Sequence, residues 1–157
     1  MARSVYLETS IVSYLTARPS RDLVTAARQE LTREWWEHRR GAFDLYVSEA
    51  VLAEAQVGDA NAAARRSEAL RSIPLLEINP QITQLAHAVA VALNLPSRVA
   101  ADALHIAVAA GHGIDFLLTW NSTHIANAEM RPTVERACRD GGFLPPILCT
   151  PDELMGG

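Results

Sequence analysis

The chain has 157 residues, and its 14 basic and 18 acidic side chains give a formal net charge of −4. This length and a hydrophobic content of 49% predict a single domain, residues 1–157, with one core. All the basic residues are arginines, which excludes phosphate loops, Schiff bases and pyridoxal chemistry that depend on a lysine amine. The acidic balance argues against binding nucleic acid through bulk charge and leaves a local arginine groove open.

Cysteine usage and hydropathy predict a cytoplasmic protein without a membrane partner. Cys138 and Cys149 are too far apart for a CxxC pair, and two thiols cannot build a disulfide framework. The longest apolar run, residues 99–110, contains two polar side chains and is typical of a buried helix rather than a membrane span. Glu8 interrupts the one apolar stretch that could begin a signal peptide.

The first half of the chain alternates short apolar strands with helices. Ser10 and Ser48 are placed to cap helices that follow the first two strands, and Gly41 is placed to stop the long helix between them. The expected elements are a strand at 4–7, helices at 10–16 and 22–40, a strand at 43–47, and helices at 49–57 and 60–71.

The second half continues the alternation, which predicts an α/β fold. Short, wholly apolar strands are typical of a parallel sheet covered on both faces, so we expect a three-layer sandwich with a central, mainly parallel five-stranded sheet. Residues 155–157 are expected to fray. The expected elements are a strand at 75–78, helices at 80–94 and 98–112, a strand at 116–119, a helix at 129–140 and a strand at 147–149.

Polar residues that follow the strands are candidates for a functional site, because the carboxyl ends of parallel strands meet at one edge. Glu8 follows the first strand, Glu54 lies shortly after the second, and Asn121 follows the fourth. Asp102 lies in a strongly apolar helix, where an unsatisfied carboxylate is costly. The alternatives are a strand-end acid for Glu8, a solvated surface glutamate for Glu54, and a helix N-terminal charge for Asp102.

A convergence of Glu8, Glu54 and Asp102 predicts a cation site. Repulsion among three carboxylates must be relieved by proton uptake or by a cation. Carboxylate and amide oxygens suit Mg²⁺ or Mn²⁺, whereas zinc prefers His or Cys ligands, which are not grouped in this sequence. A magnesium site can lower the pKa of water and stabilise charge on a phosphate, which phosphodiester hydrolysis requires.

Four short segments follow in order: YLETS at 6–10, SEAVLAE at 48–54, ADALHIA at 101–107 and LLTWN at 117–121. Together they resemble the PIN domain and, more narrowly, the VapC-like toxins of bacterial toxin–antitoxin operons. The resemblance spans residue 5 to about residue 150. It implies a three-layer α/β sandwich, a magnesium-dependent endoribonuclease that cleaves RNA with metal-activated water, a cognate antitoxin protein, and a homodimer.

The resemblance also implies which residues form the site. Glu8 matches the first acid of the family, Glu54 the second, Asp102 the third and Asn121 the fourth. The first acid is ordinarily aspartate and the fourth is often aspartate, so this chain departs from the pattern at two positions. We therefore expect one metal ion at Glu8, Glu54 and Asp102, with any second ion recruited together with the substrate phosphate.

Several neighbouring side chains have two interpretations. Thr9 and Ser10 can orient Glu8 or donate to a phosphate oxygen, although Ser10 can instead simply cap its helix. His105 lies one helical turn beyond the third acid and can touch the site. A histidine on an alanine-rich face is more often a satisfied core residue, and we favour that role for His105.

Aromatic and arginine residues supply the remaining candidates. Trp120 and His124 follow the fourth strand and can stack on or hydrogen-bond an unpaired base, or Trp120 can cover the core. Trp35 and the following tryptophan are typical of packing or of a partner surface. The pairs at 39–40 and 65–66 are candidate phosphate contacts, with a solvated face as the default.

Two other functions compete with a metal-dependent ribonuclease. Glu8 and Asn121 motivate a catalytically impaired PIN-fold module that binds RNA or a protein. A phosphohydrolase with an aspartyl-phosphate intermediate is disfavoured, because glutamate closes the first strand and the chain has no lysine to hold a phosphate.

Overall fold

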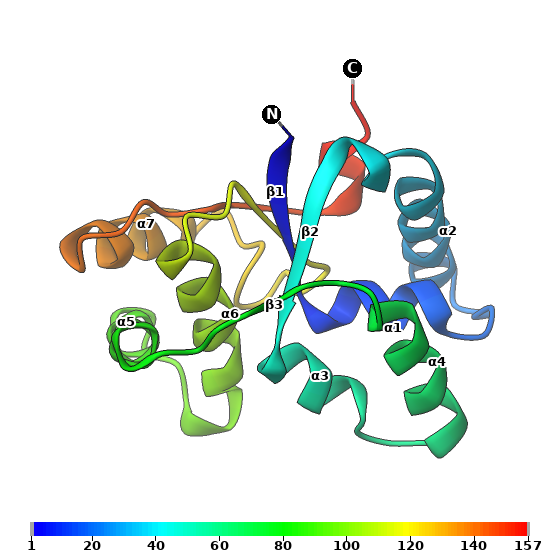
Figure 1. Cartoon of the computed structure of the whole chain (residues 1–157), viewed down its shortest axis with the longest axis horizontal. Coiled ribbons are helices and arrows are strands. Elements are labelled where there is room, and N and C mark those ends of the chain that lie inside the picture. Colours follow the sequence, from blue (N-terminus) through cyan, green and yellow to red (C-terminus); the bar gives the residue numbers. More distant parts are fainter. Residues whose placement is uncertain (1, 157) are drawn as a thin grey trace.

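The computed structural model describes residues 2–156, which contain a parallel five-stranded sheet with helices on both sides (Figure 1). The strand order is β3-β2-β1-β4-β5, so the first strand, β1 (Arg3–Leu7), is central. β2 (Phe43–Ser48) and β3 (Leu75–Leu76) lie on one side of it, and β4 (Phe116–Leu118) and β5 (Ile147–Cys149) on the other. The predicted α/β sandwich is confirmed, and the described pairings are entirely rather than mainly parallel.

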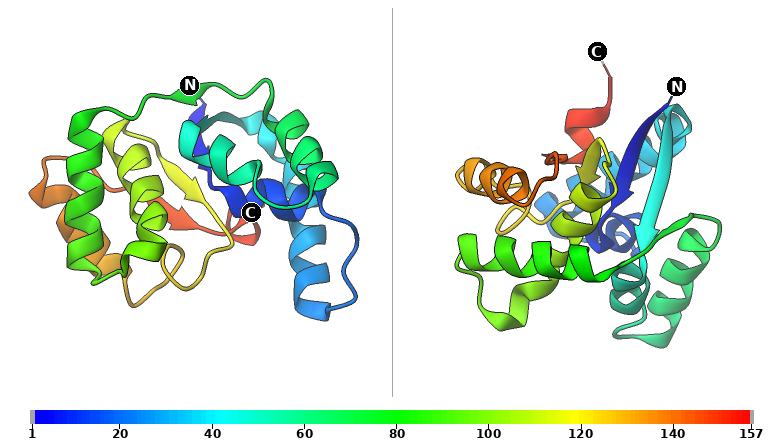
Figure 2. Two further views of the ribbon diagram at one scale, coloured as in Figure 1. Left: turned by 90° about the horizontal axis from the view of Figure 1, so that it is seen from below. Right: turned by 60° about the vertical axis from the view of Figure 1, so that its left-hand side comes forward.

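The helices form two groups, which Figure 2 shows from two further directions. Helices α1 to α4 pack on one another to the right of β1 in Figure 1, and α5, α6 and α7 lie to its left, with α5 packed on both of the others. Their bounds are α1 (Thr9–Thr16), α2 (Leu23–His38), α3 (Glu49–Ala55), α4 (Ala60–Leu70), α5 (Pro80–Ala92), α6 (Ala100–Gly111) and α7 (Arg131–Asp140).

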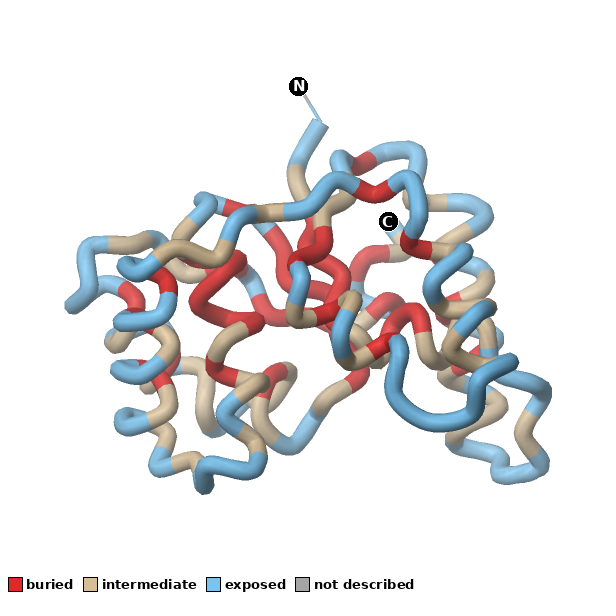
Figure 3. The backbone as a smooth tube through the Cα atoms, turned by 60° about the horizontal axis from the view of Figure 1, so that its bottom comes forward, coloured by how far each residue is buried: buried red, intermediate tan, exposed pale blue. Residues whose placement is uncertain are grey.

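The core lies along the central strands. Val5, Tyr6 and Leu7 are at most 1% exposed, and β4 is buried throughout. Figure 3 shows buried residues gathered at the centre of the molecule, with exposed ones on the outer helices and loops. Within residues 2–156 no helix combines the length and hydropathy needed to cross a bilayer. The continuous burial explains why these strands are apolar runs rather than alternating patterns.

The predicted helix caps in the first half of the chain are wrong. Helix α1 begins one residue early, with Glu8 at its N-cap position, so Ser10 lies inside the first turn. The long helix α2 ends before Gly41, which lies in a short 3₁₀ turn. Ser48 precedes α3 without capping it, because its hydroxyl bonds to Tyr6. The Ser10 hydroxyl bonds instead to Glu8 and to the backbone N–H of Trp120.

The second half differs from prediction in smaller ways. The helix expected at 98–112 begins with a 3₁₀ turn, Ser97–Val99, so Asp102 lies in the first turn of α6. β3 has two residues rather than four, and α7 begins at residue 131 rather than 129. Met155 packs against the core and Gly157 lies outside the described residues, so the fraying expected for residues 155–157 stays a prediction.

Candidate metal centre

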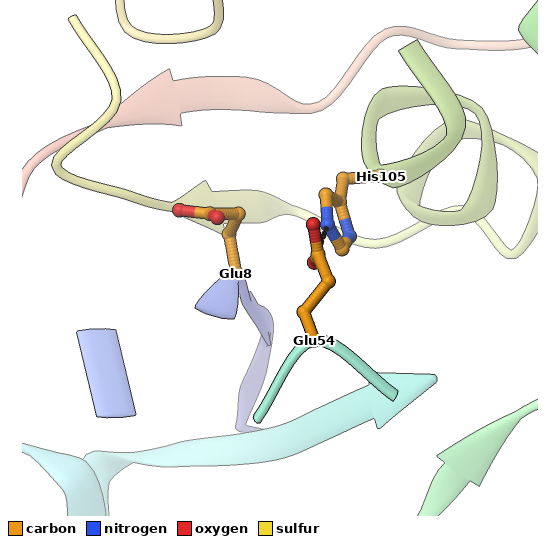
Figure 4. Close-up of side chains that lie close together, drawn as sticks. All are labelled: Glu8, Glu54 and His105. Atoms are coloured by element: carbon orange, nitrogen blue, oxygen red, sulfur yellow. Dashed lines mark hydrogen bonds and ion pairs between the residues drawn. The ribbon is translucent and has the colours of Figure 1, made fainter. Parts of the chain in front are cut away.

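Three side chains meet at the carboxyl end of the central strand (Figure 4). Glu8 directly follows β1, Glu54 comes from α3, and His105 from α6. One ligand atom from each lies within 4.8 Å of the others. The chain crosses from β1 to β2 on one side while β4 pairs with β1 on the other, so this is a topological switch point of the sheet. Two of the three predicted carboxylates therefore converge, together with a histidine.

Glu8 is held by two hydroxyl groups. Its side chain is buried, and its Oε1 accepts hydrogen bonds from Ser10 Oγ at 2.5 Å and Thr119 Oγ1 at 2.6 Å. Backbone N–H groups of Trp120 and Asn121 donate to these hydroxyl oxygens at 2.8 and 2.9 Å, which orients both hydroxyl protons toward the carboxylate. Among the described residues, Oε2 of Glu8 has no hydrogen-bond partner.

Glu54 is held in the same manner by a hydroxyl and an imidazole. Its Oε1 accepts from Thr9 Oγ1 at 2.5 Å and faces His105 Nε2 at 2.6 Å. Burial acts to raise the pKa of Glu54, but the hydrogen bonds from His105 and Thr9 and the charge on His105 outweigh it and hold the pKa below its usual value. Glu54 is thus ionised at neutral pH, and its Oε2 has no bond within residues 2–156.

His105 is both a core residue and part of the site. The ring is 0% exposed, and its Nδ1 lies 2.7 Å from the Tyr6 hydroxyl, which lies 2.7 Å from Ser48 Oγ. An ionised Glu54 can only accept a hydrogen bond, so Nε2 carries a proton. Burial raises the pKa of Tyr6 far above its usual value, which keeps the phenol protonated. A buried hydrogen-bonded chain therefore runs from Ser48 through Tyr6 and His105 to Glu54.

Asp102 and Asn121 have other contacts. Asp102 is not in the three-residue group; its Oδ2 lies 2.8 Å from Nδ1 of His124. Asp102 precedes His105 by three residues on α6, so the two side chains lie on adjacent turns of one face. Asn121 Oδ1 accepts the backbone N–H groups of Thr123 and His124 at 3.2 and 3.0 Å, which occupies both of its lone pairs.

The tryptophans belong to the core. Trp120 is 8% exposed, its Nε1 donates to Thr32 Oγ1 at 2.8 Å, and its ring meets Tyr14 edge to face. The interpretation of Trp120 as a cover for the core is therefore the better one, while its backbone N–H bonds to the Ser10 hydroxyl next to Glu8. Trp35 is 0% exposed, which confirms its packing role.

Two of the candidate phosphate-binding arginines stabilise helix ends. Arg65 Nε donates to the carbonyl of Thr16 at 3.1 Å, and Arg66 Nε donates to that of Ala55 at 2.8 Å. These carbonyls end α1 and α3, where helices leave acceptors without internal partners. Arg39 similarly donates to the Leu154 carbonyl at 3.2 Å. These guanidinium groups do more than cover a solvated face.

Sequence reasoning missed three residues that support the site: Tyr6, Ser48 and Thr119. Tyr6 lies two positions before Glu8, which continues the extended backbone of β1, so both side chains point to the same side of the sheet. A tyrosine in the middle of a buried strand needs a partner for its hydroxyl, and this signal was available in the sequence. Thr119 directly follows β4, just as Glu8 directly follows β1.

The arrangement fits a divalent cation. Each glutamate has one oxygen held by two donors and the other without a partner among the described residues, so two carboxylate oxygens are available for a ligand. Carboxylate oxygens suit Mg²⁺ and Mn²⁺. His105 is poorly placed to add a nitrogen ligand, because both ring nitrogens have hydrogen-bond partners.

Comparison with known proteins agrees with this geometry. A family model described as the PIN domain matches residues 5–129, most of the chain. A comparison with curated protein sequences gives no match. PIN domains are generally metal-dependent nucleases, and the carboxylate group at the end of β1 fits that chemistry. From its fold, its site and this match, the chain belongs to the PIN domain family.

Proposed function

We propose that this protein is a magnesium-dependent endoribonuclease that cleaves phosphodiester bonds in single-stranded or loop RNA. The observation that carries the proposal is the meeting of Glu8 and Glu54, from separate segments, with a pre-oriented oxygen on each. The PIN fold supports RNA as the substrate. Because the net charge is −4, RNA contacts must be local rather than a product of overall charge.

Glu8, Glu54 and Asp102 are the proposed ligands of Mg²⁺ or Mn²⁺. Asp102 supplies the third carboxylate from the turn of α6 that precedes His105. When bound, the ion supplies Lewis acidity, which lowers the pKa of water and offsets the charge that develops on phosphorus oxygens. Ser10 and Thr119 hold Glu8 oriented by donating two hydrogen bonds to it.

The remaining site residues act on Glu54 and on the substrate. Thr9 and His105 together donate to Glu54 Oε1 and leave its other oxygen for the cation. His105 keeps Glu54 in place because the Tyr6 hydroxyl fixes the far side of its ring. Asn121, the fourth family position, serves the turn after β4 rather than the ion.

We further propose that the protein is a VapC-like toxin with a cognate antitoxin, that it forms a homodimer, and that it acts in the cytoplasm. The order of the four motifs supports the toxin subtype. The two cysteines are unpaired and buried, which fits a reducing compartment. Co-purification with the product of an adjacent small gene and loss of cleavage in that complex would test the antitoxin.

Cleavage of RNA by the purified protein with Mg²⁺, Mn²⁺ or EDTA tests the activity. We expect cleavage only with metal, and a loss of at least about 100-fold in Glu54→Gln and Asp102→Asn. His87→Ala is a matched control, since His87 is exposed on α5 and lies outside the metal group. Cleavage by Asp102→Asn at the wild-type rate would overturn the ligand assignment.

A catalytically impaired module that binds RNA or a protein is the second candidate. It is favoured by the glutamate at position 8, where the family ordinarily has aspartate, and by the use of the Asn121 oxygen in a turn. Calorimetry with Mn²⁺ separates the two functions. A nuclease takes up Mn²⁺ in a manner that depends on Glu54 and Asp102, whereas a binding module retains RNA or protein binding without that uptake.

A further inference from the structure

We infer that His124 and Asn121 form a positioning unit that holds the carboxylate of Asp102 for the cation. The inference rests on the proposed function, because it takes Asp102 as a metal ligand. It assigns His124 a role at the site and gives Asn121 a different role from that of a fourth ligand. His124 is a positioning residue, since it acts through Asp102.

The contact between His124 and Asp102 has the geometry of an orienting hydrogen bond. Nδ1 of His124 lies 2.8 Å from Oδ2 of Asp102, and the two side chains are 23% and 16% exposed. A carboxylate can only accept, so Nδ1 donates. Partial burial makes the bond more valuable than one at a fully hydrated surface, because less water competes for the same atoms.

The same pattern holds for all three proposed acids. Glu8 and Glu54 each have one oxygen held by two donors, and Asp102 has Oδ2 held by His124. The second oxygen of each has no hydrogen bond within residues 2–156. Each of the three carboxylates therefore has one oxygen that can bind a cation. This arrangement suits a metal site better than a hydrogen-bond network in which every oxygen is used.

Asn121 fixes the loop that carries His124. Its Oδ1 accepts the N–H groups of Thr123 and His124, and its main-chain carbonyl accepts that of Ala126 at 2.8 Å. Ile125, between them, is 0% exposed and anchors the loop in the core. The side-chain oxygen and the main-chain carbonyl of Asn121 both hold this turn, and the turn sets the position of the His124 ring.

Hydrogen bonds also connect this turn to Glu8. The backbone N–H of Asn121 donates to Thr119 Oγ1 at 2.9 Å, and Thr119 donates to Glu8 at 2.6 Å. Hydrogen bonds thus run from Glu8 through Thr119 and Asn121 to His124 and on to Asp102. The segment after β4 joins the acid that follows β1 to the acid of α6, two proposed ligands from different parts of the fold.

The expected effect is on metal affinity. Partners of metal-ligating side chains orient them before the ion arrives, and losing such a partner typically weakens metal affinity by about 10–100-fold. We expect His124→Ala to weaken Mn²⁺ binding by about 10-fold, measured by calorimetry and by electron paramagnetic resonance, while the melting temperature falls by at most a few degrees. His87→Ala, on the exposed face of α5, is the control and should bind Mn²⁺ as the wild type does.

A conservative pair of variants separates positioning from packing. Asparagine places an amide N–H where Nδ1 of histidine lies, whereas glutamine places it near Nε2. His124→Asn should therefore bind Mn²⁺ within about threefold of the wild type, and His124→Gln should be as weak as His124→Ala. An affinity within about twofold of the wild type in His124→Ala, or no recovery in His124→Asn, overturns the inference.

A double-mutant cycle tests the role of Asn121. Asn121→Ala should weaken Mn²⁺ binding in the same way, and the double variant should be no weaker than His124→Ala alone, because both changes act through one contact. If the two losses of Mn²⁺ affinity add in the double variant, this result would contradict the proposed positioning unit. Asp102→Asn distinguishes a failure of the ligand assignment from a failure of the positioning unit. Unchanged Mn²⁺ affinity there defeats the ligand assignment, whereas a loss there without one in His124→Ala defeats the positioning unit alone.

Discussion

Two acid–histidine pairs border the site, and they are built in different ways. Glu54 and His105 are 2.6 Å apart, with a fully buried ring whose second nitrogen bonds into the core. Asp102 and His124 are 2.8 Å apart at the edge of the site, and a surface turn supports the ring. The comparison shows that the same orienting bond can be tied to the stability of the fold or kept largely separate from it.

The largest expected difference between the pairs is in stability. His105→Ala should lower the free energy of unfolding by about 2–4 kcal/mol, because it leaves a cavity and removes one of the two partners of the Tyr6 hydroxyl. His124→Ala should cost less than about 1 kcal/mol, because its ring is partly solvated. Urea denaturation of both variants measures the difference, and equal losses would remove the distinction between the pairs.

The pair of Glu54 and His105 can be probed from the buried side of the His105 ring with Tyr6→Phe. This change keeps the ring but leaves His105 Nδ1 and the Ser48 hydroxyl without their partner, at a cost of about 1–3 kcal/mol. Tyr46→Phe on β2 is a matched control, since Tyr46 is less buried and its hydroxyl has no hydrogen bond within residues 2–156. A loss in Tyr46→Phe as large as in Tyr6→Phe would contradict the importance of the buried chain.

Acid should weaken the pair of Glu54 and His105. The pKa of Glu54 lies below its usual value in the folded protein, so its stabilising contribution is present above the unfolded pKa and is lost as pH falls through the folded one. Between about pH 5 and pH 3, the free energy of unfolding should therefore fall less steeply in Glu54→Gln than in the wild type. Denaturation at a series of pH values measures the slopes, and identical slopes would contradict the assignment.

The smallest expected effect concerns the buried thiols, which report whether a substitution loosens the core. Burial raises the pKa of Cys138 to about 11 and that of Cys149 to about 12. Both remain thiols at pH 8 and should react slowly with a disulfide reagent in the wild type and in His124→Ala. His105→Ala should react faster, because lower stability increases the population of open states. Equal rates in the two variants would argue against a closed core around His105.

The same raised pKa values predict a loss of stability at alkaline pH. The protonated thiols favour the folded protein fully below the unfolded pKa of about 8.5, and this contribution declines as pH rises toward the folded values. Denaturation between about pH 8 and pH 11 should show a smaller decline in Cys138→Ala than in the wild type.

The fold and the position of the acids could be predicted because both depend on local patterns. Apolar strands followed by polar residues mark the carboxyl edge of a parallel sheet, and Glu8 and Glu54 indeed meet there. The choice of partner for each polar group could not be predicted in this way. The cap rules assign Ser10 and Ser48 to helix N-termini, but the Ser10 hydroxyl takes its alternative expected role and donates to Glu8, and the Ser48 hydroxyl bonds to Tyr6 on a different strand.

The histidines also have hydrogen-bond partners that local sequence patterns do not predict. His105 was expected in the core and is there, yet its ring also donates to Glu54, a residue that follows a different strand. Asp102 was expected beside the other acids, but its present partner comes from the loop after β4. Such pairings depend on which strands are neighbours, and strand order is a property of the whole sheet.

The position of β4 beside β1 has a consequence for how the protein is made. Glu8 and Glu54 leave the ribosome early, whereas His105, Thr119 and the turn at Asn121 follow much later in synthesis. The strand that completes the site must insert next to the first strand of the chain after most of the polypeptide exists. A nascent chain of this topology holds Glu8 and Glu54 with Ser10 and Thr9 but without Thr119 and His105, so each acid gains its second hydrogen-bond donor only late in translation.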